Sequence, residues 1–358
     1  MLGKRYENDG KPVLPLNSLQ IEQKKQIELK FAKDIYQFES VPCAVCNSKD
    51  FETLSQKDRY GLPIHIVICR QCGLIQTNPR MTQESYNDFY NYEYRKFYSG
   101  KESPDDEFFY EQYRRGIKIY SFLEKKGVFS KPPSESFVFE IGCGAGGILQ
   151  YFRKRGCRVQ GIDLGEEYLA FGKERYGLNL SVGTIADTSL DQTPDIIISS
   201  HILEHILSPK GELAYINRIL SPNGVIYIEV PGVKNLMNSY EMDFLRMLHH
   251  AHTYHFTLTT LRNLIETNGF QMVYGDEIIR SIFKKTDLIF SNAILKNDYE
   301  PAMVYLNKLE RLKDLFPFPP YRLKQLPEKI IIRILKVFGV WRVAKRVYWK
   351  LKGEGCMK

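Results

Sequence analysis

The 358-residue sequence predicts an α/β fold with three parts: a small cysteine-rich segment, a mostly parallel sheet covered by helices, and a helical C-terminal extension. Three observations predict it. Two Cys-x-x-Cys pairs lie between residues 41 and 80, short apolar runs alternate with helical segments from residue 137 onward, and basic residues concentrate near the C-terminus. Hydrophobic residues make up 43% and charged residues 26% of the chain, which is typical of a folded globular protein and excludes a disordered one.

Helical segments are expected on both sides of the cysteine-rich segment. Residues 17–37 carry apolar side chains at helical spacing, which predicts an amphipathic helix within a first part at 1–40. The cysteine-rich segment follows at 41–80. Residues 81–136 form a linker rich in tyrosine and phenylalanine, expected to be largely helical, and the sequence SKPPSES at its end marks a boundary because prolines interrupt regular structure.

Strands and helices alternate in the next part of the chain, residues 137–292. Apolar runs predict buried strands, and the segments between them have helical character, which is the pattern of a parallel sheet with helices on both faces. A further helix at 257–270 ends at Gly269. The expected strands are 137–142, 158–163, 194–200, 225–230, 271–277 and 285–292, and the other helices are 146–155, 166–176 and 209–220.

A glycine-rich loop follows the first of these strands and opens a helix. It reads Glu140-Ile-Gly142-Cys143-Gly144-Ala-Gly146-Gly147. Glycines let the backbone turn tightly and approach a ligand, and the helix start offers free N–H groups. Asp163 ends the next strand, where an acid accepts both ribose hydroxyls of an adenosine. The spacing fits the dinucleotide pattern G-x-G-x-x-G and also E-x-G-x-G-x-G, and a packing turn is the third interpretation.

The pattern E-x-G-x-G-x-G resembles motif I of the class I S-adenosylmethionine-dependent methyltransferases. The run Asp195 to His205, which ends in His-x-Leu-Glu-His, resembles their fourth-strand motif, and Ile228-Glu229-Val230-Pro231 resembles the end of their fifth strand. The resemblance implies a Rossmann-like seven-stranded sheet. It also implies cofactor contacts from Glu140, Gly142, Cys143, Gly144, Gly146, Asp163, Leu164, Thr184, Ser200 and His201.

The same His-x-x-Glu-His run, from His201 to His205, also matches a metalloprotease pattern. That site needs both histidines on one helix and a distant carboxylate ligand. Because the run here directly follows a strand, the protease interpretation is disfavoured.

Cys43, Cys46, Cys69 and Cys72 form two Cys-x-x-Cys knuckles separated by 22 residues. Four thiolates in this arrangement suit tetrahedral Zn²⁺, so the segment predicts a zinc ribbon with a strand near residues 62–68. A ribbon without metal and a redox pair are the alternatives. His65 alternates with isoleucines and is not expected to be a ligand. No stripe of basic and aromatic residues accompanies the knuckles, so no nucleic-acid partner is expected.

The zinc ribbon, the tyrosine-rich segment and the sheet, taken together over residues 43–290, resemble the deoxysugar C-methyltransferases and their relatives in bacterial polysaccharide gene clusters. The resemblance implies C- or O-methylation of a sugar or glycan intermediate and substrate contacts from Tyr92 and Tyr94, which alternatively pack between domains. The full-length family carries a further C-terminal domain, whereas about 68 residues follow the sheet here. Methylation of another small molecule or a lipid, a non-catalytic cofactor-binding scaffold, and an NAD-dependent enzyme therefore remain open.

Six of the seven histidines fall between residues 201 and 255. Methyl transfer to carbon or oxygen needs a base, and histidine serves as one near neutral pH. His252 matches the family's Glu-His position, with Ala251 in place of the glutamate, and is the first candidate base; His255 is the second. His249 and His250 are expected to be solvated.

The net charge of +8 is concentrated in one segment of the chain. Residues 322–352 hold ten of the 50 basic residues and one acidic residue, and both tryptophans, Trp341 and Trp349, lie there. Within a last part at 293–358, this composition predicts basic amphipathic helices that contact a membrane surface, with packing on the body, dimerisation, or binding to an acidic glycan or nucleic acid as alternatives. The oligomeric state is left open. No secretory signal and no long apolar run is visible, so a cytoplasmic location is expected.

Overall fold

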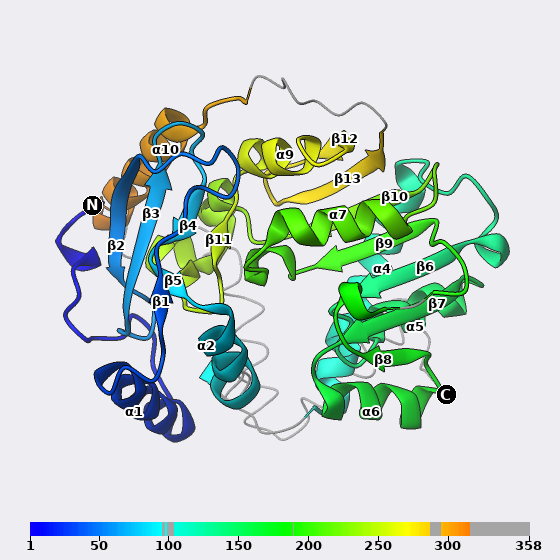
Figure 1. Cartoon of the computed structure of the whole chain (residues 1–358), viewed down its shortest axis with the longest axis horizontal. Helices are drawn as coiled ribbons and strands as arrows, with labels where there is room; N and C mark the ends of the chain where they lie inside the picture. Colours follow the sequence, from blue (N-terminus) through cyan, green and yellow to red (C-terminus); the bar gives the residue numbers. More distant parts are fainter. Residues whose placement is uncertain (95–96, 99–103, 189, 287–294, 316–358) are drawn as a thin grey trace.

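The computed structural model describes residues 1–94, 97–98, 104–188, 190–286 and 295–315. Its larger part is a seven-stranded sheet in the order β12-β13-β10-β9-β6-β7-β8 (Figure 1). The strands β6 to β10 pair in parallel, whereas β13 runs antiparallel to both β10 and β12. The bounds are β6 Phe137–Ile141, β7 Arg158–Asp163, β8 Leu180–Val182, β9 Ile196–Ser200, β10 Val225–Glu229, β12 Phe270–Gly275 and β13 Arg280–Lys285. The predicted α/β, Rossmann-like sheet is confirmed.

Helices cover both faces of this sheet because side chains of its strands alternate between two apolar cores. One core joins Val138 and Ile198 to the helices α4, α5 and α6. The other joins Phe139 and Ile226 to α7 and α9. The helices are α4 Asp106–Lys125, α5 Gly147–Lys154, α6 Glu166–Tyr176, α7 Pro209–Ile219 and α9 Leu258–Glu266.

The last strand of the sheet lies earlier in the sequence than predicted. We expected it at 285–292, whereas β13 occupies Arg280–Lys285 and residues 287–294 lie outside the described residues. In β13 the side chains of residues 281–283 are buried, so the strand is set by the pairing with β10 and not by the later apolar run. The three-residue strand β8 was also not predicted.

The N-terminal part contains a four-stranded sheet in the order β11-β4-β3-β2. Three of its strands, β2 Phe51–Lys57, β3 Pro63–Cys69 and β4 Ile75–Thr77, come from the cysteine-rich segment. The edge strand β11, Tyr254–His255, comes from the segment between β10 and α9 of the other part. The strands β1 Phe38–Glu39 and β5 Arg80–Met81 form a separate pair. The two halves of the molecule therefore share a sheet.

Short helices complete the N-terminal half. Helix α1, Ser18–Ala32, is shorter than the predicted 17–37; it begins at the capping residue Asn17 and fully buries only Ile27. Helix α2, Gln83–Asp88, leads into a π-helical turn at Phe89–Tyr94, and the short helix α8 spans Phe244–Met247.

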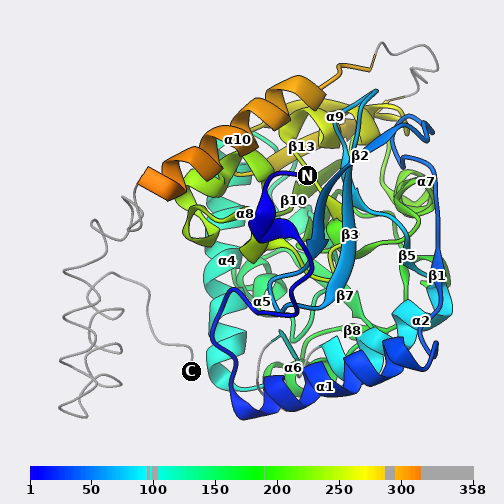
Figure 2. The same ribbon diagram turned by 90° about the vertical axis from the view of Figure 1, so that its left-hand side faces the viewer.

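Helix α10, Tyr299–Leu315, packs its apolar side chains against the N-terminal sheet, at the end opposite to α1 (Figure 2). The basic helices expected at 322–352 lie outside the described residues. Within the described ranges, no helix combines the length and the apolar character needed to cross a bilayer.

Candidate active site

The glycine-rich loop lies at the carboxyl end of β6, beside the point where the strand order of the parallel sheet reverses. Gly142, Gly144 and Gly146 have φ angles of 68°, 54° and 76°, a left-handed backbone that favours glycine. A Cβ atom on Gly142 would lie 1.9 Å from Cδ1 of Ile202, the residue two positions after β9. The loop after β9 therefore packs directly on the glycine-rich loop.

Asp163, at the end of β7, holds this region together. Its Oδ2 accepts a hydrogen bond from the backbone N–H of Gly144 at 2.9 Å, and its Oδ1 accepts one from Gly165 at 2.7 Å. Both oxygens lie at the carboxyl end of β7, where an acid would accept the ribose hydroxyls of an adenosine. Leu164 beside it is 53% exposed, an apolar surface that suits an adenine ring. The hydroxyl of Thr184, at the end of β8, donates to Asp187 at 2.7 Å.

Two further predicted cofactor residues are buried beneath the loop. Burial raises the pKa of the Glu140 carboxyl well above its usual range, and its Oε2 has no hydrogen-bond partner. Cys143 belongs to the loop, but its side chain packs into the core against Gly161. Only its backbone atoms are therefore placed to contact a cofactor. The left-handed glycines, the carboxylate of Asp163 and the unpaired Glu140 oxygen form a cradle that fits S-adenosylmethionine.

Helix α4 closes the loop from outside, a contact that sequence reasoning missed. The Gln112 side chain donates to the carbonyl oxygen of Cys143 at 3.0 Å and accepts from the backbone N–H of Gly147 at 3.3 Å. A glutamine on an amphipathic helix carries no local signal that it will meet a loop thirty residues further along the chain.

We expect Gln112→Ala to weaken binding of S-adenosylhomocysteine roughly tenfold, because losing two hydrogen bonds of ~1 kcal/mol each loosens the loop. Isothermal titration calorimetry measures this change. Gln26→Ala, which removes an exposed glutamine bonded to Glu22 on α1, is the matched control and should bind like the wild type. Equal affinity of the Gln112→Ala variant and the wild type would contradict the role of α4.

The end of β9 and the loop after it carry the remaining predicted cofactor residues. Ser200 ends β9, and its hydroxyl donates to Glu229 of β10 at 3.3 Å. His201 follows with a left-handed φ of 58°, and its N–H donates to the Glu229 carbonyl at 2.7 Å. Only Leu203–His205 form a turn of 3₁₀ helix, so His201 and His205 do not share an α-helix and the metalloprotease arrangement is absent.

The ring of His252 contacts those of three other buried histidines, His205, His249 and His255, and its Nε2 lies 4.0 Å from the buried Glu204; we call these five residues the histidine cluster. The ring centroid of His252 lies 3.8 Å from that of His249, 4.8 Å from that of His205 and 5.8 Å from that of His255. Burial is the main cause that lowers the pKa of each imidazole, to about 3 for His255 and well below the usual range for His252. These rings are therefore neutral near pH 7, the form that accepts a proton or binds a metal.

The expectation that His249 and His250 are solvated was wrong. Both are buried, because His250 lies against Pro63 of β3 and His249 lies against the rings of Tyr94 and Tyr98. His249 belongs to the histidine cluster. The Nε2 atom of His250 lies 2.9 Å from the carbonyl oxygen of Pro63 and takes no part in the cluster.

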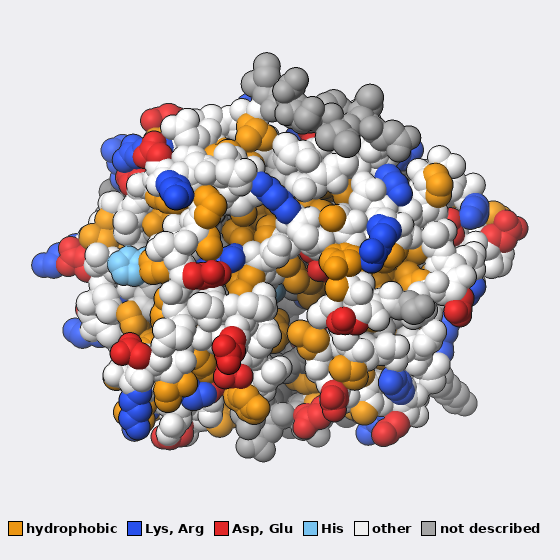
Figure 3. Space-filling model, in the orientation of Figure 1, with side chains coloured by type: hydrophobic (Ala, Val, Ile, Leu, Met, Phe, Trp, Pro, Cys, Tyr) orange, Lys and Arg blue, Asp and Glu red, His pale blue; other side chains and the backbone are white. Residues whose placement is uncertain are grey.

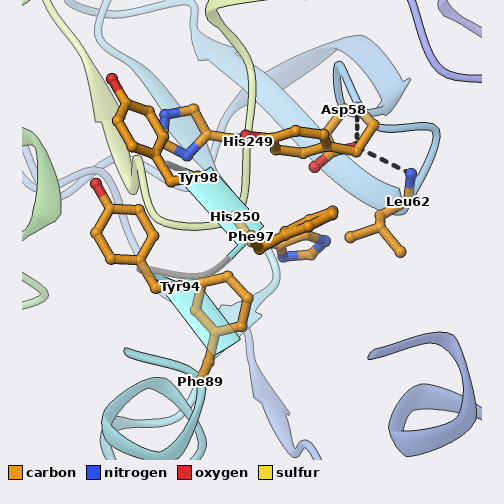
Figure 4. Close-up of a pocket in the computed structure, with 9 residues that line it drawn as sticks. Asp58, Leu62, Phe89, Tyr94, Phe97, Tyr98, His249 and His250 are labelled. Carbon is orange, nitrogen blue, oxygen red and sulfur yellow. Dashed lines mark hydrogen bonds between the residues drawn. The ribbon is translucent and has the colours of Figure 1, made fainter. Parts of the chain in front are cut away.

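Of the two predicted substrate tyrosines, only Tyr94 lies at the histidine cluster. Its ring lies 5.7 Å from His205 and 6.5 Å from His249 (Figure 4). Tyr90, four residues earlier, stacks on Tyr94 at 4.4 Å and also faces His205. Tyr92, in the same π-helical turn, is 66% exposed. Helical spacing in Tyr90-x-x-x-Tyr94 is the signal that could have identified this pair.

Three hydrogen bonds from different parts of the chain hold residues 251–253 in place. Thr253 donates its N–H to the carbonyl of Glu204 at 2.8 Å, and Tyr86 donates its hydroxyl to the carbonyl of Ala251 at 2.8 Å. The Thr77 hydroxyl in β4 donates to the His252 carbonyl at 3.2 Å. In Figure 1 the carboxyl ends of β6, β7 and β9 point toward this segment and toward α2, and Figure 3 shows a hollow between the two halves with hydrophobic side chains at its rim.

The four knuckle cysteines come together as predicted. The Sγ atoms of Cys43 and Cys72 lie 3.4 Å apart, and those of Cys46 and Cys69 lie 3.5 Å apart. All four ligand atoms are within 4.8 Å of one another, and none of the four cysteines forms a disulfide. Tetrahedral zinc bonds of ~2.3 Å place thiolates at nearly this separation, so the residues fit Zn²⁺. His65 is exposed and lies outside this group.

Comparison with known proteins gives one family match and several partial relatives. Residues 111–274 match the family described as "Methyltransferase domain". The chain is 22% identical to the C-methyltransferase NovU of Streptomyces niveus over 299 residues, which is 81% of this chain and 65% of the relative. It is 31% identical to the ubiquinone biosynthesis O-methyltransferase of Aeromonas salmonicida over 98 residues, 25% of this chain and 41% of the relative.

Among solved structures, the amino pentose methyltransferase CalS10 of Micromonospora echinaspora matches with a TM-score of 0.39 and 15% identity, over 49% of this chain and 96% of that chain. The chain thus spans less than two thirds of the length of the relatives it matches in sequence. The match at 111–274 covers the glycine-rich loop, Asp163 and the histidine cluster. Residues 111–274 therefore form a methyltransferase domain.

Proposed function

We propose that this chain transfers a methyl group from S-adenosylmethionine to a carbon or oxygen atom of a sugar or glycan intermediate, in bacterial surface polysaccharide or related biosynthesis. The observation that carries the proposal is the contact between Gly142 and Ile202. Through it, the segment that begins the histidine cluster lies directly on the glycine-rich loop. The similarity to the Streptomyces C-methyltransferase supports transfer to carbon.

The cofactor supplies an electrophilic methyl group on a sulfonium sulfur, and the chain's own residues position the two reactants. The glycine-rich loop and Asp163 hold the nucleoside end. Ser200 and His201 border the end of β9, where the methyl group would meet the acceptor. His252, with His255 behind it, would accept the proton that the acceptor atom loses as its bond to the methyl carbon forms and the S–CH₃ bond breaks, leaving S-adenosylhomocysteine.

We also propose that Cys43, Cys46, Cys69 and Cys72 hold one structural Zn²⁺. Cys69 ends β3, and Cys72 lies just before β4, the strand that pairs with β11. The metal would therefore fix the sheet whose edge strand carries His255.

Two measurements test the methyltransferase proposal. Calorimetry should detect S-adenosylhomocysteine binding and no NAD⁺ binding, and tight NAD⁺ binding alone would overturn the proposal. A panel of nucleotide-linked sugars, with and without S-adenosylmethionine, should then yield a product that has gained one methyl group by mass spectrometry.

The His252→Ala variant should lose methyl transfer at least about 100-fold while still binding S-adenosylhomocysteine, since general bases contribute 10²–10⁴-fold to rate. His65→Ala, at an exposed histidine on β3, is the control and should keep full activity. Unchanged turnover in His252→Ala would remove His252 from the mechanism. Cofactor binding without methylation of any sugar would favour a different acceptor or a scaffold.

A further inference from the structure

Three members of the histidine cluster, Glu204, His205 and His252, have potential ligand atoms that all lie within 4.8 Å of one another. Their side chains come from two separate segments, the turn after β9 and the loop before β11. Each is more than nine-tenths buried, with exposures of 1%, 8% and 6%. The chain thus brings two imidazoles and one carboxylate together away from solvent.

The hydrogen bonds of this group are incomplete. Neither oxygen of the Glu204 carboxylate has a hydrogen-bond partner, and the Nδ1 atoms of His205 and His252 also have none. An unpaired buried carboxylate costs several kcal/mol, so native structures nearly always give it a partner. Two imidazole Nε2 atoms face its Oε1 at longer range, His205 at 3.8 Å and His252 at 4.0 Å. A positive species between these atoms would supply the missing partner.

We propose that Glu204, His205 and His252 bind a divalent first-row transition-metal ion, with Zn²⁺ the best match. Two imidazoles and one carboxylate are the protein donors of catalytic zinc sites, which keep a fourth position for water or substrate. Ligands at ~2.1 Å in a tetrahedron lie about 3.4 Å apart, so the observed 3.8 and 4.0 Å need only a small contraction. His201, whose Nδ1 lies 3.4 Å from the same Glu204 oxygen, would help to orient the carboxylate.

The inference rests on the proposed methyl transfer and deepens it. The vacant coordination position of the metal would bind an oxygen of the acceptor, either the hydroxyl to be methylated or a carbonyl beside the reacting carbon. The metal would thereby lower the pKa of the acceptor group that loses the proton. With a metal bound, His252 would be a ligand and not the base proposed above, and the leaving proton would pass to His249. The acceptor loses one proton and gains the methyl group, with no change in oxidation state.

The test counts metal ions in the full-length protein, loaded with Zn²⁺ and dialysed. Wild-type protein should hold two equivalents, one at the four cysteines and one at Glu204, His205 and His252. Glu204→Gln should hold one equivalent. His252→Asn, which should also hold one, provides a second test of the same site if Glu204→Gln does not fold. His65→Ala is the control and should hold two. Circular dichroism melting checks that each variant is folded.

Cobalt substitution separates the two sites. Thiolate-to-Co²⁺ charge-transfer absorption reports only the cysteine site, so it should be intact in Glu204→Gln and His252→Asn while the second equivalent of Co²⁺ is lost. One equivalent in the wild type, carried by the cysteines, overturns the proposal, as does a second equivalent that survives in both variants. These readouts need neither cofactor nor acceptor, so a failure here leaves S-adenosylhomocysteine binding and methyl transfer to decide the proposed function separately.

Discussion

Asp163→Ala is expected to weaken S-adenosylhomocysteine binding by at least roughly 100-fold. The substitution removes the acceptor of two backbone N–H bonds, from Gly144 at 2.9 Å and from Gly165 at 2.7 Å, and with it the acceptor for the ribose. Hydrogen bonds to a charged group contribute ~1.5–3 kcal/mol each, and every 1.4 kcal/mol is tenfold in affinity. Calorimetry with S-adenosylhomocysteine measures the loss.

Asp195→Ala is the matched control. It removes an aspartate side chain from the same sheet, but at the amino-terminal ends of the strands, whereas Asp163 lies at their carboxyl ends. Asp195 precedes β9, where its carboxylate accepts from the Phe137 N–H at 3.0 Å and from the Lys131 ammonium at 2.7 Å. This variant should unfold at a lower temperature and bind the cofactor product with unchanged affinity. Equal losses of affinity in both variants would mean that Asp163 acts only through overall stability.

Cys69→Ser is expected to abolish zinc binding at the cysteines and to lower the melting temperature by roughly 10 °C. Structural zinc contributes ~10 kcal/mol or more to folding, so losing one thiolate ligand forfeits a large share of it. The four cysteines also touch the apolar core that includes Ile226, Leu261 and Phe256, so the damage reaches beyond the ribbon. Zinc content by mass spectrometry and thermal melting measure the two effects.

Cys157→Ser provides the comparison for this prediction. Cys157 is also buried, yet it packs beneath the sheet with Val159 and Phe152 and lies outside the cysteine group. The loss of a buried thiol should cost ~1 kcal/mol and leave the zinc content intact. A Cys69→Ser protein that melts like Cys157→Ser and keeps its zinc would contradict a structural metal at the knuckles.

The sequence predicts the parallel sheet well because strands buried on both faces read as continuous apolar runs. Thus β6 and β7 form where 137–142 and 158–163 were expected. The strand β8 has only three residues, too few to show any period. The last strand was expected too late because the sequence has three consecutive apolar residues at 288–290 and only two, Ile282 and Phe283, within β13.

Individual residues of the candidate site could be predicted only where they belong to a short, continuous stretch of sequence. The glycine-rich loop, Asp163 and the cysteine knuckles are such motifs. The burial of His249 and His250, the contact of Gln112 with the glycine-rich loop and the exposure of Tyr92 depend on which distant segments cover which loops. Local periodicity says nothing about those contacts, because they arise from packing between the two halves.

The pairing of β11 with β4, with Tyr254 opposite Gln76 and His255 opposite Ile75, constrains how this chain could be recombined with others. A chimera that imports a foreign N-terminal unit would leave the two-residue edge strand without its proper neighbour, and the imidazoles beside it would shift. Residues 41–81 and 249–256 must therefore be exchanged together. The same constraint predicts that, across natural relatives, substitutions in these two segments are inherited as one block.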